Sequence, residues 1–472
     1  MKRSLLAVLN SAFLDATAIA EQVRDGSRKA AEVLAEARAA ATSARSLNAL
    51  ITEDWESAAL AAENLDRRRA AGERLGPLAG VPFSVKDVIA VAGLPVTAGS
   101  LAFEGNVATT TAPAVQRLVE ADAILVGKTN CPEFAFSMTS DSPLLGRTAN
   151  PRFPEITPGG SSGGEAASLA AGISALGIGT DFGGSVRWPA QCVGIAALRP
   201  GLDALPGAGQ VPGIGGNFGA DETIPVMGPG MQGTFQTIGP MARSVRDLRT
   251  AFLVMSGARD AEAAVPDLKS GAQHLRIAWT DGSDLGPVRQ EVTALMERLA
   301  RQLAEDGHNV LHEPTLFNDC LPSYNTLRAL DPMVDLAAAV AGREHQITAT
   351  NLRTIEVSLS ATPAAVKQAW ESAETARTAA VDRIEAFDVV LLPVAGGPAA
   401  DPDGRLDIDG RLTEGWEIMG HCRAVTLTGC PVVSLPVALS AQGWPLSVQI
   451  VAGPAGELQA LNFAAYLERL GI

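Results

Sequence analysis

The segment from Thr157 to Ser185, TPGGSSGGEAASLAAGISALGIGTDFGGS, constrains the fold of this chain more than any other stretch. Its two glycine-flanked serines, Ser161 and Ser185, lie 24 residues apart, and a run of small residues and a short apolar run separate them. This pattern predicts a helix followed by a buried strand, an arrangement that returns both serine loops to one end of a sheet. We therefore expect an α/β fold with a functional site at that end.

Apolar runs bounded by glycine continue along the chain and indicate a single large α/β/α sandwich, with a mixed central sheet covered by helices. Residues 1–75 contain no proline and carry apolar residues at helical spacing, so they predict a helical N-terminal arm packed on a core of residues 76–472. A helix is expected over 287–305. The expected strands of the core are residues 123–126, 175–178, 276–279, 309–312, 387–392, 431–435 and 446–451. No linker separates the parts, so we interpret the whole chain as one domain.

The composition is that of a folded globular protein and argues against several classes of function. Apolar residues make up 47% of the chain and charged residues 19%, unlike a disordered protein. The net charge of −15 would repel a phosphate backbone, so we expect no nucleic-acid partner. The five cysteines lack CxxC spacing, which predicts neither disulfides nor a metal site. Because we find no run of about 18 apolar residues and no signal peptide, we expect no membrane span and a cytoplasmic location.

The serines of the glycine-rich segment allow different interpretations. Ser162 and Glu165 match the S-x-x-E capping box, so Ser162 is predicted to cap the helix that follows. Ser161 and Ser185 have no such local explanation. Glycine-rich loops often only form tight turns, and a phosphate cradle would need the GxxxxGK[ST] pattern, which is missing here.

A serine nucleophile is the third interpretation, and the loop before Ser185 favours it. Consecutive backbone N–H groups with little side-chain bulk can stabilise a developing oxyanion. The candidate donors of this oxyanion hole are the N–H groups of Phe182, Gly183, Gly184 and Ser185.

Lys86 is the candidate base for such a nucleophile. It lies in the apolar stretch GVPFSVKDVIAVAG, where a strand would bury it and lower the pKa of its amine. An ion pair with Asp87 or Asp181 is the alternative interpretation of this lysine. A histidine base also stays open, although all five histidines lie C-terminal to the serine loops.

At these residues the chain resembles the amidase signature family of serine hydrolases. The stretches that carry the resemblance are GVPFSVKDV, GKTNCPEFAFSMTS, NPRFPEITPGGSSGGE, GTDFGGSVRWPA and GPMARSVRD. The resemblance implies that Lys86, a cis Ser161 and the nucleophile Ser185 form a catalytic triad that cleaves a carboxylic amide through an acyl-enzyme. It implies no metal and no organic cofactor.

The resemblance also suggests residues around this triad. The segment Ala135 to Met138 would lie beside the substrate, which makes Phe136, Ser137 and Met138 candidate binding residues. Arg187 is interpreted as support for the loop of Ser185. The glycine-rich span 207–237 is interpreted either as an apolar lid or as an ordinary surface loop.

The expected partner is a small-molecule amide, with an ester, anilide or carbamate as open variants, and a homodimer is left open. The alternative function is that of the glutaminase subunit of a tRNA-dependent amidotransferase. That subunit has a tyrosine-rich helical segment, whereas this chain contains only Tyr324 and Tyr466. We therefore expect an amidase that acts alone.

Overall fold

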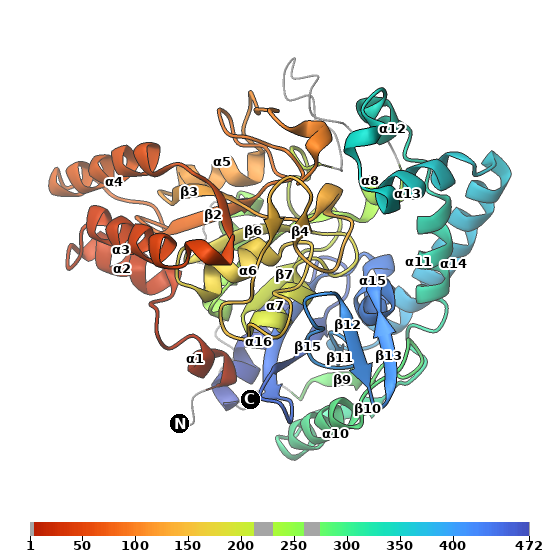
Figure 1. Ribbon diagram of the computed structural model, residues 1–472. Helices are drawn as coiled ribbons and strands as arrows, with labels where there is room; N and C mark the ends of the chain where they lie inside the picture. Colours follow the sequence, from red (N-terminus) through yellow and green to blue (C-terminus); the bar gives the residue numbers. More distant parts are fainter. Residues whose placement is uncertain (1–3, 212–229, 259–273, 472) are drawn as a thin grey trace.

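A computed structural model describes residues 4–211, 230–258 and 274–471 of the chain (Figure 1). The helices are α1 (Leu5–Leu9), α2 (Ala16–Asp25), α3 (Ala30–Ser43), α4 (Trp55–Ala70), α5 (Pro113–Glu120), α6 (Gly163–Ala170), α7 (Arg187–Val193), α8 (Met231–Phe235), α9 (Val245–Ser256), α10 (Gln290–Glu305), α11 (Cys320–Leu330), α12 (Val334–Val340), α13 (Ala349–Leu359), α14 (Pro363–Glu385), α15 (Gly420–Thr428) and α16 (Glu457–Leu470). The strands are β1 (Leu50–Glu53), β2 (Pro82–Lys86), β3 (Ile124–Thr129), β4 (Asp141–Ser142), β5 (Gly146–Arg147), β6 (Leu176–Asp181), β7 (Ala196–Arg199), β8 (Thr237–Ala242), β9 (Arg276–Trp279), β10 (Asn309–His312), β11 (Val389–Pro393), β12 (Arg405–Ile408), β13 (Arg411–Glu414), β14 (Val432–Leu439) and β15 (Pro445–Val451).

One mixed sheet of 11 strands runs through the described chain in the order β1-β3-β2-β6-β8-β7-β14-β15-β11-β9-β10. The sheet contains two groups of parallel strands, β3-β2-β6 and β11-β9-β10. The strands between these two groups pair antiparallel with their neighbours. The predicted α/β fold with a mixed central sheet is therefore confirmed.

Alternating residues of the central strands face two separate hydrophobic cores. In β7, Ala196 and Leu198 lie in the core that includes residues of α9 and α16. Ala197, between them, lies in a second core with α6 and α7. Because successive side chains of a strand point to opposite faces, helices cover both faces of the sheet.

The N-terminal region is less uniformly helical than predicted. Residues 50–53 form β1, which pairs antiparallel with β3 at one edge of the main sheet. The prediction of a purely helical arm missed this strand, because its four residues are too few to interrupt the helical pattern. The division of the chain into an arm and a core stays a prediction.

The expected core strands coincide with observed ones. Residues 276–279 and 309–312 are strands β9 and β10, and the other predicted runs overlap β3, β6, β11, β14 and β15. Among the described helices, none is both long and apolar enough to cross a membrane.

Candidate active site

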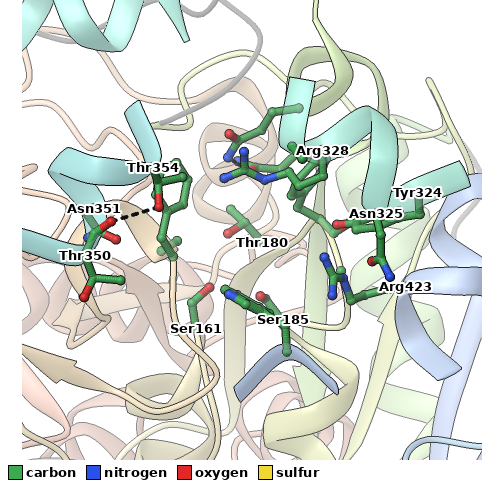
Figure 2. Close-up of a pocket in the computed structure, with 18 residues that line it drawn as sticks. Ser161, Thr180, Ser185, Tyr324, Asn325, Arg328, Thr350, Asn351, Thr354 and Arg423 are labelled. Atoms are coloured by element: carbon green, nitrogen blue, oxygen red, sulfur yellow. Dashed lines mark hydrogen bonds between the residues drawn. The ribbon is translucent and has the colours of Figure 1, made fainter. Parts of the chain in front are cut away.

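The carboxyl ends of two neighbouring parallel strands form the floor of the candidate site. Lys86 is the last residue of β2, and β6 runs beside it in parallel register, with Val85 opposite Ile178. The loop that contains Ser161 precedes α6, and the loop that contains Ser185 follows β6. Figure 2 shows Ser161, Thr180 and Ser185 close together at the floor of the pocket. The tertiary structure thus brings the predicted serine loops and the predicted lysine to one end of the sheet.

Lys86 is fully buried and in contact with hydroxyl groups. Its Nζ lies 2.6 Å from Ser161 Oγ and 2.9 Å from Thr180 Oγ1. Burial lowers the pKa of the Lys86 amine from its ordinary value of 10.5 to about 8. A substantial fraction of this amine is therefore neutral near pH 8 and able to accept a proton.

The acidic residues considered as ion-pair partners of Lys86 contact other cations. Asp87 Oδ1 lies 3.3 Å from the Nζ of Lys128, which is also buried. Asp181 is paired with Arg187, with Oδ1 2.8 Å from Nη2. Within the described part of the chain, Lys86 forms no ion pair, so the ion-pair interpretation of this lysine is wrong.

The backbone next to Ser161 packs against the backbone of residues 137–139. The Gly160–Ser161 peptide bond is cis, as the resemblance implied. A side chain at position 160 could not fit, because its Cβ would lie 2.6 Å from the carbonyl carbon of Met138 and 2.7 Å from the oxygen of Ser137. Glycine at this position therefore lets two backbone segments pack directly against each other.

Ser162 occupies the N-cap position of α6, but the predicted capping box does not form. Its side chain accepts no hydrogen bond from the helix, and its Oγ donates to the carbonyl of Thr180 at 3.4 Å. The N–H of Gly163 donates to Ser140 Oγ instead. The buried carboxyl of Glu165 accepts hydrogen bonds from hydroxyls of β2 and β3, so it is not available to the N-cap backbone.

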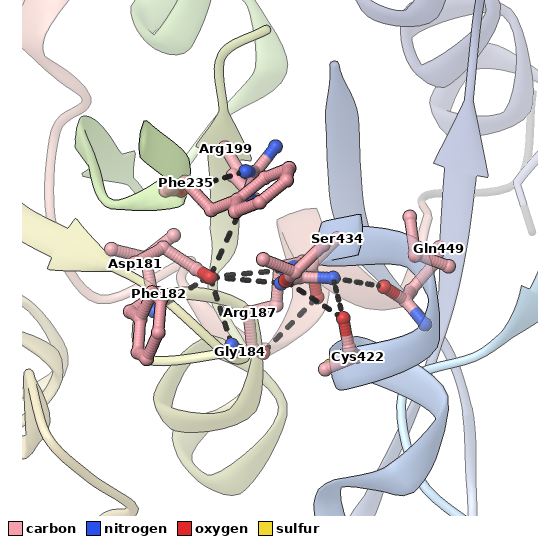
Figure 3. Close-up of polar contacts among 12 residues, drawn as sticks. Asp181, Phe182, Gly184, Arg187, Arg199, Phe235, Cys422, Ser434 and Gln449 are labelled. Atoms are coloured by element: carbon pink, nitrogen blue, oxygen red, sulfur yellow. Dashed lines mark hydrogen bonds and ion pairs between the residues drawn. The ribbon is translucent and has the colours of Figure 1, made fainter. Parts of the chain in front are cut away.

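A buried ion pair shapes the loop between β6 and α7 (Figure 3). Both carboxylate oxygens of Asp181 accept from the Arg187 guanidinium, at 2.8 and 3.0 Å. The carboxylate also accepts the N–H groups of Gly184 and Val186, at 2.8 and 3.1 Å. Burial opposes ionisation of Asp181, but the charges of Arg187 and Arg199 hold its pKa well below the usual range.

Arg187 contacts the loop and its surroundings, in agreement with the supporting position expected for it. Besides Asp181, its guanidinium donates to Gln449 Oε1 at 2.7 Å, to Thr426 Oγ1 at 2.7 Å and to the carbonyl of Cys422 at 3.0 Å. The side chain is fully buried and does not line the pocket described below.

The expected oxyanion donors differ in their availability. The N–H of Gly184 is already bound to Asp181, so in this structure it is not free for a substrate. Among the described residues, no hydrogen-bond acceptor contacts the N–H groups of Phe182, Gly183 and Ser185. These three N–H groups remain the candidate donors of the predicted oxyanion hole.

A pocket of about 270 Å³ opens above Ser161 and Ser185. Of the predicted substrate-binding residues, Phe136 lines this pocket, but Ser137 and Met138 do not. The Oγ of Ser137 is paired with Thr139 Oγ1 at 3.1 Å, and the Met138 side chain is buried in a core beside Trp188. Their backbone packs directly against Gly160.

Several residues of the pocket had no signal in the local sequence. Thr180 contacts Lys86, while Tyr324, Arg328 and Arg423 enter the wall from α11 and α15. Helices α11 and α15 are distant in sequence from both serine loops. Only a prediction of long-range contacts would therefore place Tyr324, Arg328 and Arg423 at this pocket. No histidine is among the described pocket residues, which argues against the histidine alternative for the base.

Two other expectations concern the glycine-rich span 207–237 and the metal site. Most of the supposed lid, residues 212–229, lies outside the described residues. At its end, Gln232 of α8 lines the pocket. Over the described ranges, no group of His, Cys, Asp and Glu side chains is arranged to hold a metal ion.

Comparisons with known proteins define the class of this chain. Residues 32–461 match the sequence model of the family described as Amidase, so the chain belongs to the amidase family. The resemblance found in the sequence is confirmed. The protein is accordingly a hydrolase that cleaves the C–N bond of carboxylic amides.

Individual relatives cover most of the chain. It is 32% identical over 441 residues to the indoleacetamide hydrolase of Bradyrhizobium diazoefficiens, covering 90% of this chain and 80% of the relative. It is 31% identical over 500 residues to a subunit of the glutamyl-tRNA(Gln) amidotransferase of Deinococcus deserti, covering 97% and 96% of the two chains. A crystal structure of an amidase has a TM-score of 0.83 at 26% identity and covers 97% of this chain and 100% of that one.

Proposed function

We propose that the chain hydrolyses amides through an acyl-enzyme on Ser185, with Ser161 and Lys86 as the proton relay. Ser185 Oγ attacks the carbonyl carbon while its proton passes to Ser161 Oγ, and the Ser161 proton passes to the neutral amine of Lys86. The reverse transfer protonates the leaving nitrogen as the C–N bond breaks. Water then attacks the ester by the same relay, which releases the acid and restores Ser185.

One observation carries this proposal, namely the 2.6 Å contact between Ser161 Oγ and the buried Lys86 Nζ. A buried amine with a lowered pKa can accept a proton, and a hydroxyl at this distance can transfer one. Ser185 lines the same pocket as Ser161, and its carbonyl accepts the N–H of Ser162 at 3.2 Å, which ties the two serine loops together.

The open N–H groups of the loop support the same reaction. When Ser185 attacks, the carbonyl oxygen becomes an oxyanion, and N–H donors fixed in place stabilise it without reorganisation. Gly183 and Ser185 supply two such donors, and Phe182 a third. The bidentate pair of Asp181 and Arg187 holds the loop in the shape that exposes them.

The glutaminase alternative is favoured by the relatives named as glutamyl-tRNA(Gln) amidotransferase subunits. The described lining of the pocket argues against it. Glutamine carries an α-ammonium group, and none of the described lining residues is acidic, so nothing there would pair with this charge. Hydrolysis of an amide by the purified chain alone, with no partner protein, would favour the stand-alone amidase.

The test is the variant Ser185→Ala assayed with an uncharged anilide. We expect kcat to fall at least about 10⁴-fold, because the nucleophile is lost, and mass spectrometry of the quenched wild type to detect an acylated peptide that contains Ser185. Ser137→Ala is the matched control, since its hydroxyl does not line the pocket, and its kcat should stay within about threefold. A Ser185→Ala enzyme with near wild-type turnover would refute the proposal.

A further inference from the structure

Two arginines line the pocket, although the proposed reaction uses neither. Arg328 belongs to α11 and Arg423 to α15, and Figure 2 shows both side chains directed toward the space above Ser161 and Ser185. Both side chains are half-buried. Because a guanidinium group stays charged in proteins, two positive charges face this small space.

Neither arginine forms an ion pair within the described part of the chain. No ion pair joins Arg328 or Arg423 to a described acidic residue, whereas the buried Arg187 has Asp181 as its partner. Asp331, at the end of α11, directs its carboxylate to the backbone N–H groups of α8 instead. In a chain with a net charge of −15, this pocket combines two cations with no acidic group among its described lining residues.

Aromatic rings hold both guanidinium groups in place. Arg328 lies over the rings of Phe136 and Phe182, with 5.0 and 5.8 Å between its Cζ and the ring centroids. Arg423 lies over the ring of Tyr324 at 4.8 Å. A cation–π contact uses no hydrogen-bond acceptor, so it positions a guanidinium group without consuming all of its five N–H donors.

The two arginines also lie against the loop that leads to Ser185. A Cβ built on Gly183 would lie 3.3 Å from Cγ of Arg423, and Phe182 is one of the rings under Arg328. Since Gly183 is a proposed oxyanion donor, a group bound by these arginines would be close to the bond that is cleaved.

We propose that the substrate is an amide that also carries a carboxylate, and that Arg328 and Arg423 bind this carboxylate. A carboxylate accepts paired hydrogen bonds from guanidinium groups, and it supplies the negative charge that the pocket lacks. A substrate that also carried an ammonium group would be disfavoured by the same two cations. The inference rests on the proposed function, because it assumes that amide cleavage takes place at Ser185.

The experiment compares amides that differ in charge but not in shape. The half-amides succinamate and glutaramate carry a carboxylate, and in their matched analogues, assayed at pH 7, a neutral nitro group of similar size replaces it. We expect the wild type to favour at least one half-amide over its nitro analogue by at least about tenfold in kcat/KM. Arg328→Gln and Arg423→Gln should each reduce this preference at least about fivefold.

A control variant and a binding measurement separate specificity from folding and turnover. Arg353→Gln removes the same charge from an exposed site on α13 outside the pocket, so the preference should persist. Calorimetry with succinate and glutarate, the products of these half-amides, should show binding that weakens at least about tenfold in Arg328→Gln and Arg423→Gln. Circular dichroism checks that each variant is folded.

Two results would overturn the inference. One is a wild type that hydrolyses the nitro analogues as well as the half-amides. The other is an equal loss on both kinds of substrate in the arginine variants, which would assign the arginines to the reaction itself or to the fold. In either case, Ser185-dependent hydrolysis of the neutral amides would leave the proposed function standing, whereas its absence would refute that function separately.

Discussion

The variant Lys86→Met tests the state of the buried lysine through the stability of the protein. The amine has a pKa of about 8 in the folded chain because burial disfavours its charged form, against an ordinary value of 10.5. At pH 7 the unfolded lysine is charged, and folding must either bury that charge or release its proton. The shift corresponds to a destabilisation of about 3 kcal/mol at pH 7, at about 1.4 kcal/mol for each pKa unit.

The sign of the pH dependence follows from proton binding. Between pH 8 and 10.5 the unfolded state binds more protons than the folded state, so the wild type gains stability as the pH rises through this window. Methionine has a similar size and no charge. At pH 7 it therefore removes the free-energy cost of burying the lysine, whereas near pH 10 this cost is already small in the wild type. The variant also leaves the hydroxyls of Ser161 and Thr180 without their amine partner, a cost that is the same at both pH values.

The assay is urea unfolding of the wild type and Lys86→Met at pH 7 and pH 10, with a reductant present. The difference in unfolding free energy between the two proteins should change by about 2 to 3 kcal/mol between these pH values, in favour of the variant at pH 7. Lys367→Met removes an amine from an exposed helix surface, so its effect should stay within about 0.5 kcal/mol. A difference for Lys86→Met that does not change with pH would refute the reasoning.

Three further predictions concern the pH dependence and the backbone. With an uncharged amide, kcat/KM should rise about tenfold per pH unit up to an apparent pKa near 8, and a flat profile would contradict a basic relay through Lys86. Burial lowers the pKa of His421 from 6.5 to about 4, so on acidification through this window the wild type should lose about 3 kcal/mol more in urea unfolding than His421→Asn, and an equal loss would count against this account. Gly184 has φ +116°, and an added Cβ would lie 2.6 Å from the Cβ of Cys422, so Gly184→Ala should lower kcat at least about tenfold and stability by about 2 kcal/mol or more. Gly410→Ala has a positive φ but open space around it, and should lose only about 1 kcal/mol; equal losses for both variants would show that the contact with Cys422 is unimportant.

Local patterns predicted the features that depend on short stretches of the chain. Apolar runs marked most of the expected strands, because strands that are covered on both faces of a sheet are mainly apolar. The isolated lysine in the run before Asp87 and the two glycine-flanked serines marked the candidate residues, since few structural reasons would place such groups there. The short strand β1 escaped, because its pairing with β3 is a long-range interaction and four residues carry little periodic signal.

The S-x-x-E pattern shows where a local rule fails. It predicts a helix cap at Ser162, but the carboxyl of Glu165 binds hydroxyls of Ser84 and Thr129, which belong to two other strands. A capping box contributes about 1 kcal/mol, so hydrogen bonds to distant groups in a buried site can displace it. The choice between these partners is made by the fold and is invisible in the four residues of the motif.

The sequence by itself determined that this chain has an α/β fold of the amidase family and which lysine and serines belong at its candidate site. Only the tertiary structure decided which neighbours these residues have. It left Ser137 and Met138 out of the pocket lining and brought in Arg328 and Arg423 from distant helices. The physical reason is that strands and loops follow from contacts between nearby residues, whereas the wall of a pocket is formed by side chains that meet only after the sheet and its helices have packed.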